Sequence, residues 1–341
     1  MRYRMPAEWE RHEATWIAWP HEQSDWPGKF EPIHWVYGEF ARLISRVERV
    51  RLLVPDAAAR ASARKVFAKS GVQMDMVDFF VCPTDRSWTR DFCPIFVHDE
   101  AGRVVATDWK FNGWAKYKNW KRDNAVPAAI ANKFGVPRVA IDRVLEGGAI
   151  DVNGRGTLLA TEECLLDTKT QVRNPGLSRA ETEAMLAGPL GVSKVLWLKR
   201  GIVGDDTHGH IDDVARFTDA RTVVTVVEEN RDDENWAPTQ ENLRDLEKMT
   251  DQDGQALKVV PLPMPKPVWF DGQRLPASYA NFYIANGLVV VPTFNDPSDR
   301  IALNTLARLF KGREVVGVHC VDLVLGLGTL HCMTQQQPAA R

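Results

Sequence analysis

Short runs of aliphatic and β-branched residues recur along the chain, separated by about 53 to 66 residues. They are VRLLV from Val50, RVVAT around Val104, GTLLAT around Leu158, RTVVTVV around Val223 and GLVVVP around Val289. Brief runs of this composition are typical of buried strands. Each begins a similar succession of segments, so the pattern predicts a repeated α/β unit.

A helix is expected after each of these runs, and a second apolar run follows the helix. The clearest helices are PDAAARASARKVFAKSG and LSRAETEAMLAG; in the second, Ser178 and Glu181 form a predicted capping box. The second runs are VQMDMVDFF, RVAID, KVLWL, LKVVPL and EVVGVHC. Strand–helix–strand therefore occurs five times. The pattern alone fits five modules that close on one another or two ordinary α/β domains.

Unusual polar motifs decide between these two arrangements, because each lies shortly after the second strand of a module. The candidate residues are Asp91 in DRSWTRDFCP, Glu146 in LEGGAIDVNG, His210 and Asp212 in GDDTHGHIDD, Asn281 in SYANFYIANG and Cys332 in GLGTLHCMTQQQP. Loops at equivalent places in a pseudosymmetric ring converge on its axis, and such loops commonly carry catalytic groups. We therefore expect a single domain over residues 1–341, with these side chains gathered in a central funnel.

Composition and charge narrow the functional classes. The net charge of −2 arises from 43 basic and 45 acidic residues, which are interspersed, so nucleic-acid and membrane-surface binding lack support. The N-terminal segment has no signal-like apolar core, and no run approaches the roughly 18 apolar residues of a membrane span. Five cysteines without a C-x-x-C pair favour free thiols over a disulfide framework or zinc site. A soluble cytoplasmic protein is the expectation.

Several motifs also have plainer interpretations. His208 and His210 with nearby acids resemble a weak metal site, and a separated third ligand is missing. EGG is compatible with a tight turn, and WTRD with a surface Arg–Asp pair beside a packed Trp88. The LGLG segment is not followed by a helix, so it is not a phosphate-binding loop, and no nucleotide motif occurs elsewhere. No cofactor and no metal are expected.

The candidate set indicates a cationic substrate. A cysteine, a histidine and an asparagine would suit a cysteine amidase, in which the histidine activates the thiol. Three carboxylates beside a thiol raise its pKa and suppress the thiolate. The loss of thiolate would be offset if the substrate is a cation that neutralises the carboxylates. A guanidinium fits, because it pairs bidentately with carboxylates.

The ordered motifs MPAEWERHEATWIAWP, WTRD, EGG, GDDTHGHID, ANFYIANG and HCMTQQQP resemble the agmatine deiminases, grouped with bacterial-type peptidyl-arginine deiminases in the guanidine-modifying (pentein) superfamily. The resemblance runs nearly end to end. It implies a five-bladed α/β propeller, no cofactor, and hydrolysis of a small guanidino substrate. A homo-oligomer is compatible with the resemblance. The family pattern is closer to GGGNIHC before the cysteine and DNWR near the N-terminus, whereas this chain has Leu327 and SDWPG; it also has His208 where an acid is common.

The resemblance also implies roles for individual residues. Cys332 is the nucleophile and His210 the general acid/base, while Asp91 and Asp212 hold the guanidinium nitrogens. Glu146 fixes His210 or the substrate. Asn281 and Trp88 are the further substrate-binding residues, with Trp88 lining the channel. The expected reaction converts agmatine to N-carbamoylputrescine and ammonia; arginine, peptidyl-arginine or another guanidine as substrate, and amidino transfer to an amine, are the alternatives.

Overall fold

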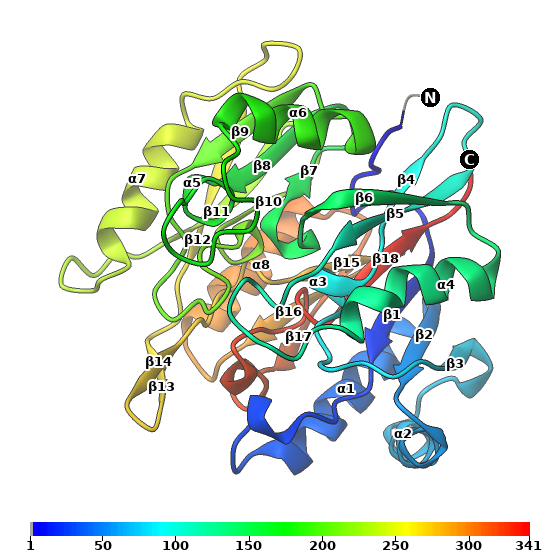
Figure 1. Ribbon diagram of the computed structural model, residues 1–341. Helices are drawn as coiled ribbons and strands as arrows, with labels where there is room; N and C mark the ends of the chain where they lie inside the picture. Colours follow the sequence, from blue (N-terminus) through cyan, green and yellow to red (C-terminus); the bar gives the residue numbers. More distant parts are fainter. Residues whose placement is uncertain (1–2) are drawn as a thin grey trace.

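The computed structural model describes residues 3–341 as a mixed α/β fold (Figure 1); the first two positions of the expected 1–341 domain lie outside the described residues. Within the described residues, no helix is both long and apolar enough to cross a membrane.

The five expected strand pairs are formed, and each pair is parallel. The pairs are β2 (Arg49–Val54) with β3 (Val77–Val81), β5 (Val104–Lys110) with β6 (Arg138–Val144), β8 (Thr157–Thr161) with β9 (Lys194–Leu198), β11 (Thr222–Val227) with β12 (Lys258–Pro263), and β16 (Leu288–Thr293) with β17 (Glu314–His319). In four of the five pairs the first strand is buried almost throughout, which explains its aliphatic and β-branched composition, while β5 is partly exposed.

Additional short strands widen these pairs into sheets of three or four strands. Four of them precede the long strand as the first arm of an antiparallel hairpin: β4 (Ile95–His98), β7 (Asp151–Val152), β10 (Ala215–Phe217) and β15 (Tyr283–Ala285). The first sheet instead has the order β18–β1–β2–β3, with β1 (His12–Ala18) and β18 (Gln335–Pro338) antiparallel. This pairing joins the two ends of the sequence and fixes the segment just after Cys332.

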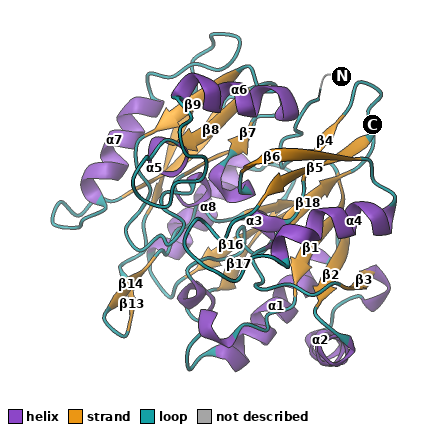
Figure 2. Cartoon of the chain, in the orientation of Figure 1, coloured by secondary structure: helices purple, strands orange, loops and turns teal. Residues whose placement is uncertain are grey.

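Most helices connect two parallel strands and lie mainly toward the periphery of the view (Figure 2), whereas the short helix Thr89–Phe92 connects β3 to β4. The helices are α1 (Phe30–Ile44), α2 (Ala57–Ser70), α3 (Thr89–Phe92), α4 (Val126–Phe134), α5 (Glu162–Leu165), α6 (Arg179–Leu190), α7 (Trp236–Leu246) and α8 (Ser298–Leu309). The capping box predicted at α6 is confirmed, since the side chains and backbones of Ser178 and Glu181 bond reciprocally. Helix α2 begins at Asp56 as N-cap and ends at Gly71, whose left-handed backbone (φ 77°) favours glycine.

A small hairpin stands apart from the five sheets. Strands β13 (Val268–Phe270) and β14 (Gln273–Leu275) pair antiparallel around a two-residue turn formed by Asp271 and Gly272. Both turn residues have positive φ, 47° and 75°, as the commonest two-residue hairpin turns require. No strand was expected here from the sequence.

Candidate active site

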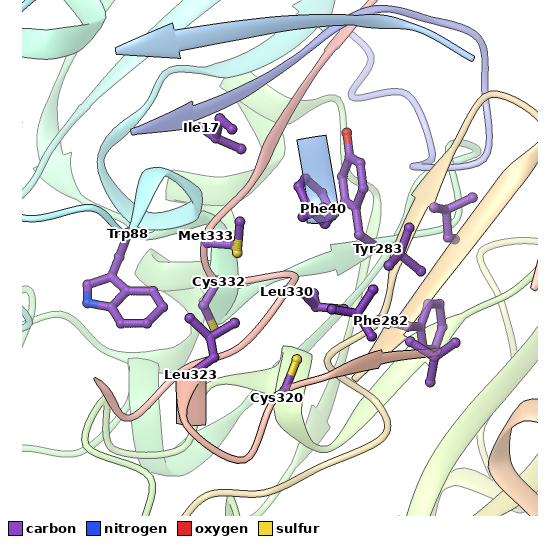
Figure 3. Close-up of a cluster of buried hydrophobic side chains, with 14 of the residues drawn as sticks. Ile17, Phe40, Trp88, Phe282, Tyr283, Cys320, Leu323, Leu330, Cys332 and Met333 are labelled. Atoms are coloured by element: carbon purple, nitrogen blue, oxygen red, sulfur yellow. The ribbon is translucent and has the colours of Figure 1, made fainter. Parts of the chain in front are cut away.

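Cys332 lies in a tight turn that leads into β18. The turn is closed by hydrogen bonds from Met333 N to Thr329 O (3.1 Å) and from Thr334 N to His331 O (3.1 Å). The side chain is 7% exposed and lies beside Trp88 and Leu323 in an apolar cluster (Figure 3). Its thiol is therefore largely, but not fully, removed from water.

Asn281, on the loop before β15, holds this turn from behind. Its Oδ1 accepts hydrogen bonds from Thr329 Oγ1 (2.7 Å) and His331 N (3.0 Å). Because a backbone N–H can only donate, this fixes the orientation of the amide, and Nδ2 faces Cys332 Sγ at 3.1 Å. Nδ2 also donates to Asp213 Oδ1 (2.9 Å). Asn281 thus presents a donor to sulfur, a contact that favours the thiolate.

Burial and three aspartates have the opposite effect and disfavour the thiolate of Cys332. Burial raises the pKa of Cys332 well above its ordinary value, and the charges of Asp212, Asp213 and Asp91 raise it further. The nearest oxygen is Asp212 Oδ2, 3.7 Å from Sγ. In the free protein the neutral thiol is therefore favoured at neutral pH.

Asp91 approaches the site from α3, in the WTRD motif. Its Oδ2 accepts from Trp114 Nε1 (2.8 Å) and its Oδ1 from Gly148 N (3.1 Å). Burial raises the pKa of Asp91 to about 6, against the opposing effect of His210. The preceding Arg90 is buried, donates to Gln336 Oε1 (2.7 Å), and is not part of a surface pair. WTRD is therefore an interior motif.

His210 lies between the carboxylates without a hydrogen-bond partner among the described residues for either ring nitrogen. Its Nδ1 is 3.8 Å from Asp91 Oδ1. Burial lowers the pKa of His210, but Asp91, Cys164 and Asp212 together hold it well above the ordinary value. We therefore assign His210 as an imidazolium at neutral pH, able to give a proton away.

The second glycine of EGG is required by close approach rather than by turn geometry. A Cβ on Gly148 would come within 2.5 Å of His210 Nδ1, 2.9 Å of Asp91 Oδ1 and 3.1 Å of Asp212 Oδ2. Three polar side chains thus converge on one glycine, and any side chain there would displace them.

Glu146 adjoins the far side of His210. Oxygen, sulfur and nitrogen atoms of Glu146, Cys164 and His210 lie within 4.8 Å of one another. Arg173 Nε donates to Glu146 Oε1 (3.0 Å), whereas Oε2 has no partner among the described residues. Arg173 therefore neutralises Glu146 through Oε1, and Oε2 is the oxygen still available to a partner.

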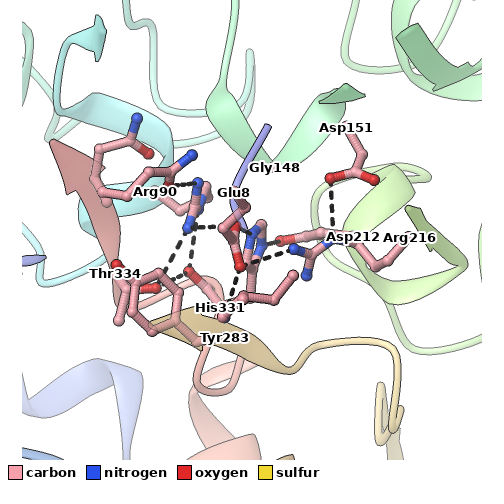
Figure 4. A network of polar contacts seen from close by, with 12 residues as sticks. Glu8, Arg90, Gly148, Asp151, Asp212, Arg216, Tyr283, His331 and Thr334 are labelled. Carbon is pink, nitrogen blue, oxygen red and sulfur yellow. Dashed lines mark hydrogen bonds and ion pairs between the residues drawn. The ribbon is translucent and has the colours of Figure 1, made fainter. Parts of the chain in front are cut away.

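A buried ionic network supports Asp212 (Figure 4). His331 Nδ1 contacts Asp212 Oδ2 at 2.7 Å, and His331 Nε2 contacts Glu8 Oε2 at 2.7 Å. Glu8 is also paired with Arg216 (3.0 Å) and Arg90 (3.4 Å). Hydrogen bonding and charge from His331 outweigh the effect of burial and lower the pKa of Asp212. Asp212 is therefore held as a carboxylate, and its Oδ1 has no hydrogen-bond partner in the described part of the chain.

A cavity of about 400 Å³ leads from the surface to Cys332. Its lining includes the buried residues Asp25, Arg86, Trp88, Asp91, Trp114, Gly328 and Cys332, and the more exposed residues Asp206, Phe270, Asp271 and Leu327 nearer the mouth. The predicted channel residue Trp88 does line the cavity, and its Nε1 donates to Asp25 Oδ2 (3.2 Å). Asn281 lies behind Cys332 and not on the cavity wall of the described residues.

Two groups of side chains have metal-ligating atoms close together: Glu146, Cys164 and His210, and Asp212, Asp213 and Cys332. In the first, Arg173 already neutralises the carboxylate. In the second, Asp212 and Asp213 already accept from His331 and Asn281. His208, the other half of the H-x-H motif, points to Asp167 (2.8 Å) and contributes to neither group. The arrangement suits an organic cation better than a metal ion.

The structure brings the predicted residues Cys332, Asp91, His210 and Asp212 to one place. Sequence reasoning missed Asp213, Trp114, Arg173, Cys164 and Glu8. The Glu8 carboxylate lies in the quoted segment MPAEWERH, but nothing in its spacing indicated a partner more than 300 residues away. Asp213 adjoins a predicted residue, and its acidic side chain was the signal available.

Comparison with known proteins agrees with this geometry. Residues 4–338 match the model of the Porphyromonas-type peptidyl-arginine deiminases. The chain belongs to this family. It is 37% identical to the agmatine deiminase of Pseudomonas aeruginosa (strain LESB58), with 99% of this chain and 96% of the relative covered.

Solved members of the family have the same fold. The agmatine deiminase of Enterococcus faecalis superposes with a TM-score of 0.92 at 32% identity, covering 98% of this chain and 96% of its own. A cysteine-to-serine variant of the C. jejuni agmatine deiminase with substrate bound gives a TM-score of 0.90 at 31% identity, and the match covers 99% of this chain and 97% of that chain.

Proposed function

We propose that this protein is a hydrolase that deiminates agmatine to N-carbamoylputrescine and ammonia. The observation that carries the proposal is the convergence of Asp91, His210 and Asp212 on Gly148, beside the thiol of Cys332. Both nitrogens of His210 and one oxygen of Asp212 are buried and unpartnered among the described residues. A planar cation with several N–H donors would satisfy the carboxylate and bring its carbon to the sulfur.

The charges that line the cavity support a substrate whose tail ends in an amine. Four aspartates line the cavity, Asp25, Asp91, Asp206 and Asp271, against one arginine, Arg86. Arg86 pairs with Asp25, and Lys116 pairs with Asp206. Among the described residues no lysine or arginine pairs with Asp91, which adjoins His210 at the inner end, or with Asp271 at the mouth, so the cavity favours a cation at each end. Agmatine has this charge pattern, whereas arginine carries a carboxylate.

In the proposed reaction the bound guanidinium first activates the thiol. Its positive charge offsets the aspartates that raise the pKa of Cys332, so the thiol loses its proton to solvent, and the Asn281 N–H stabilises the resulting thiolate. The sulfur then attacks the guanidinium carbon. His210 gives its proton to the departing nitrogen, ammonia leaves, and an amidino-cysteine remains.

The second half of the reaction uses the same groups. His210, now neutral, accepts a proton from water as the water attacks the amidino carbon. The sulfur leaves as thiolate, the hydroxyl proton of the adduct passes to solvent as the ureido carbonyl forms, and His210 is again protonated. The neighbouring Glu146, held by Arg173, orients the imidazole in both halves.

We further propose that the five sheets form the five blades of a single α/β propeller over residues 1–341, with the site in its central funnel. Support comes from the repeated parallel pair in each sheet and from the pairing of β18 with β1, which joins the ends of the chain. A cytoplasmic location is part of the proposal, supported by the absence of disulfides among the five cysteines. A role in polyamine formation follows if agmatine is the substrate.

The decisive experiment measures ureido product and ammonia from agmatine, arginine, arginine peptides and methylated arginines. We expect agmatine to be preferred, and Cys332→Ser to lose essentially all turnover while Cys93→Ser, which alters a buried cysteine that does not line the cavity, retains it. Substantial turnover by Cys332→Ser would refute the nucleophile. Preference for arginine would correct the substrate, and ammonia release only when an amine acceptor is added would identify an amidinotransferase.

A further inference from the structure

Leu327 has a backbone conformation that leucine rarely adopts. Its φ of 67° and ψ of 23° lie in the left-handed region, at the end of the short helical turn Leu323–Gly326. The conformation is held by a hydrogen bond from Leu327 N to Val324 O (2.9 Å). Left-handed backbone is unfavourable for a residue with a branched side chain, and glycine would avoid the cost. Such strain is commonly retained where it places a functional group.

The neighbours of Leu327 explain why the loop runs there. A Cβ on Gly326 would lie 2.6 Å from Trp26 Nε1 and 2.8 Å from Trp88 Cζ2. A Cβ on Gly328 would lie 3.0 Å from Trp88 Cζ3 and 3.2 Å from Cys332 Sγ. The backbone on both sides is thus pressed against tryptophans and the thiol. Leu327 supplies the one side chain of this three-residue segment, and it lines the cavity.

We propose that Leu327 is a specificity-determining residue that packs on the alkyl chain joining the guanidino group to the tail of the substrate. This inference rests on the proposed function. The chemical match is apolar: Trp88, Leu325 and Leu327 line the same cavity as the buried thiol and the charged residues Asp206 and Asp271. A substrate whose guanidinium reaches Cys332 and whose amine reaches the mouth must pass its methylene groups along this wall.

The test compares a tailed and a tailless guanidine. Leu327→Gly and Leu327→Ala are assayed with agmatine and with methylguanidine, which occupies the inner end alone. Loss of contact with about two methylene groups corresponds to a loss of about tenfold in kcat/KM for agmatine, expressed mainly in KM. The kcat/KM for methylguanidine should stay within about twofold, since Cys332, His210 and both aspartates are untouched.

A matched control separates backbone strain from substrate contact. Asn295 is another left-handed residue (φ 58°), exposed and outside the cavity. Asn295→Gly should change neither substrate's kcat/KM. Equal loss on both guanidines in the Leu327 variants, or no loss on agmatine, overturns the role of Leu327 while the proposed function stands. If the unmodified protein releases ammonia from no guanidine, the proposed function and this inference both fall.

Discussion

The two ends of the cavity are built differently. At the inner end, Cys332 and Asp91 line the cavity and His210 and Asp212 lie beside them; all four are nearly inaccessible to water, and fixed hydrogen bonds hold the thiol and both carboxylates. At the outer end, charged side chains pair in partly exposed salt bridges, and Asp271 projects from a hairpin turn. Burial makes each inner charge expensive to leave unpaired, whereas solvent screens the outer charges. The same kind of residue, aspartate, should therefore matter far more inside than outside.

The largest effect is expected for Asp91→Asn. Removing one member of a buried charge set typically costs about 3–5 kcal/mol, or roughly 200- to 5000-fold in kcat/KM for agmatine. The matched control is Asp167→Asn, which alters an aspartate that pairs with His208 and does not line the cavity. Its kcat/KM should remain within about twofold. Comparable loss in both variants would mean that general destabilisation, not cation binding, explains the effect.

A smaller loss is expected from Asn281→Ala, which removes the donor to sulfur. Hydrogen bonds to charged groups contribute about 1.5–3 kcal/mol, so kcat should fall roughly 10- to 150-fold. Iodoacetamide alkylation of Cys332, followed against pH, should show a higher apparent thiol pKa than in the unmodified protein. Thr329→Val is the control, since it removes a bond to the Asn281 carbonyl but keeps the donor to sulfur. An unchanged alkylation profile in Asn281→Ala would contradict thiolate stabilisation.

Sequence reasoning succeeded where a local pattern carried the information. The five parallel pairs, the cap at Ser178 and the convergence of Asp91, His210, Asp212 and Cys332 followed from short motifs. The partners of those residues did not. Glu8 reaches His331 only because β1 and β18 pair, and Arg173 reaches Glu146 from a long loop. The three carboxylates expected near the thiol were Asp91, Glu146 and Asp212, yet Asp213 acts on it while Glu146 adjoins His210.

A moderate effect, about tenfold, is expected from pH. Burial raises the pKa of Asp91 to about 6, and only the ionised carboxylate pairs with a guanidinium. The ionised fraction therefore rises from about one-tenth near pH 5 to about nine-tenths near pH 7. Agmatine affinity for the Cys332→Ser protein, measured by calorimetry, should increase over this range with a midpoint near the Asp91 value.

A second buried carboxylate on the cavity wall offers a control for this pH dependence, because burial also raises the pKa of Asp25 to about 6. Asp25→Asn should leave the midpoint in place if Asp91 controls binding. Loss of the pH dependence in Asp25→Asn would assign it to the buried Asp25–Arg86 pair instead.

The smallest effect on agmatine kinetics is expected from Asp271→Asn, at the outer end of the cavity. Asp271 lines the mouth, is exposed, and has a φ of 47°, a conformation that asparagine tolerates well, so Asp271→Asn should not disturb the hairpin. An exposed ion pair contributes about 0.2–1 kcal/mol, which predicts a rise of roughly 1.5- to 5-fold in KM for agmatine. Because solvent screens this charge, the rise should shrink as salt increases toward about 1 M. Methylguanidine lacks the amine, so its KM should not change. An Asp271→Asn effect as large as that of Asp91→Asn, or one that salt leaves intact, would show that the mouth closes around the substrate and that the two ends are not distinct environments.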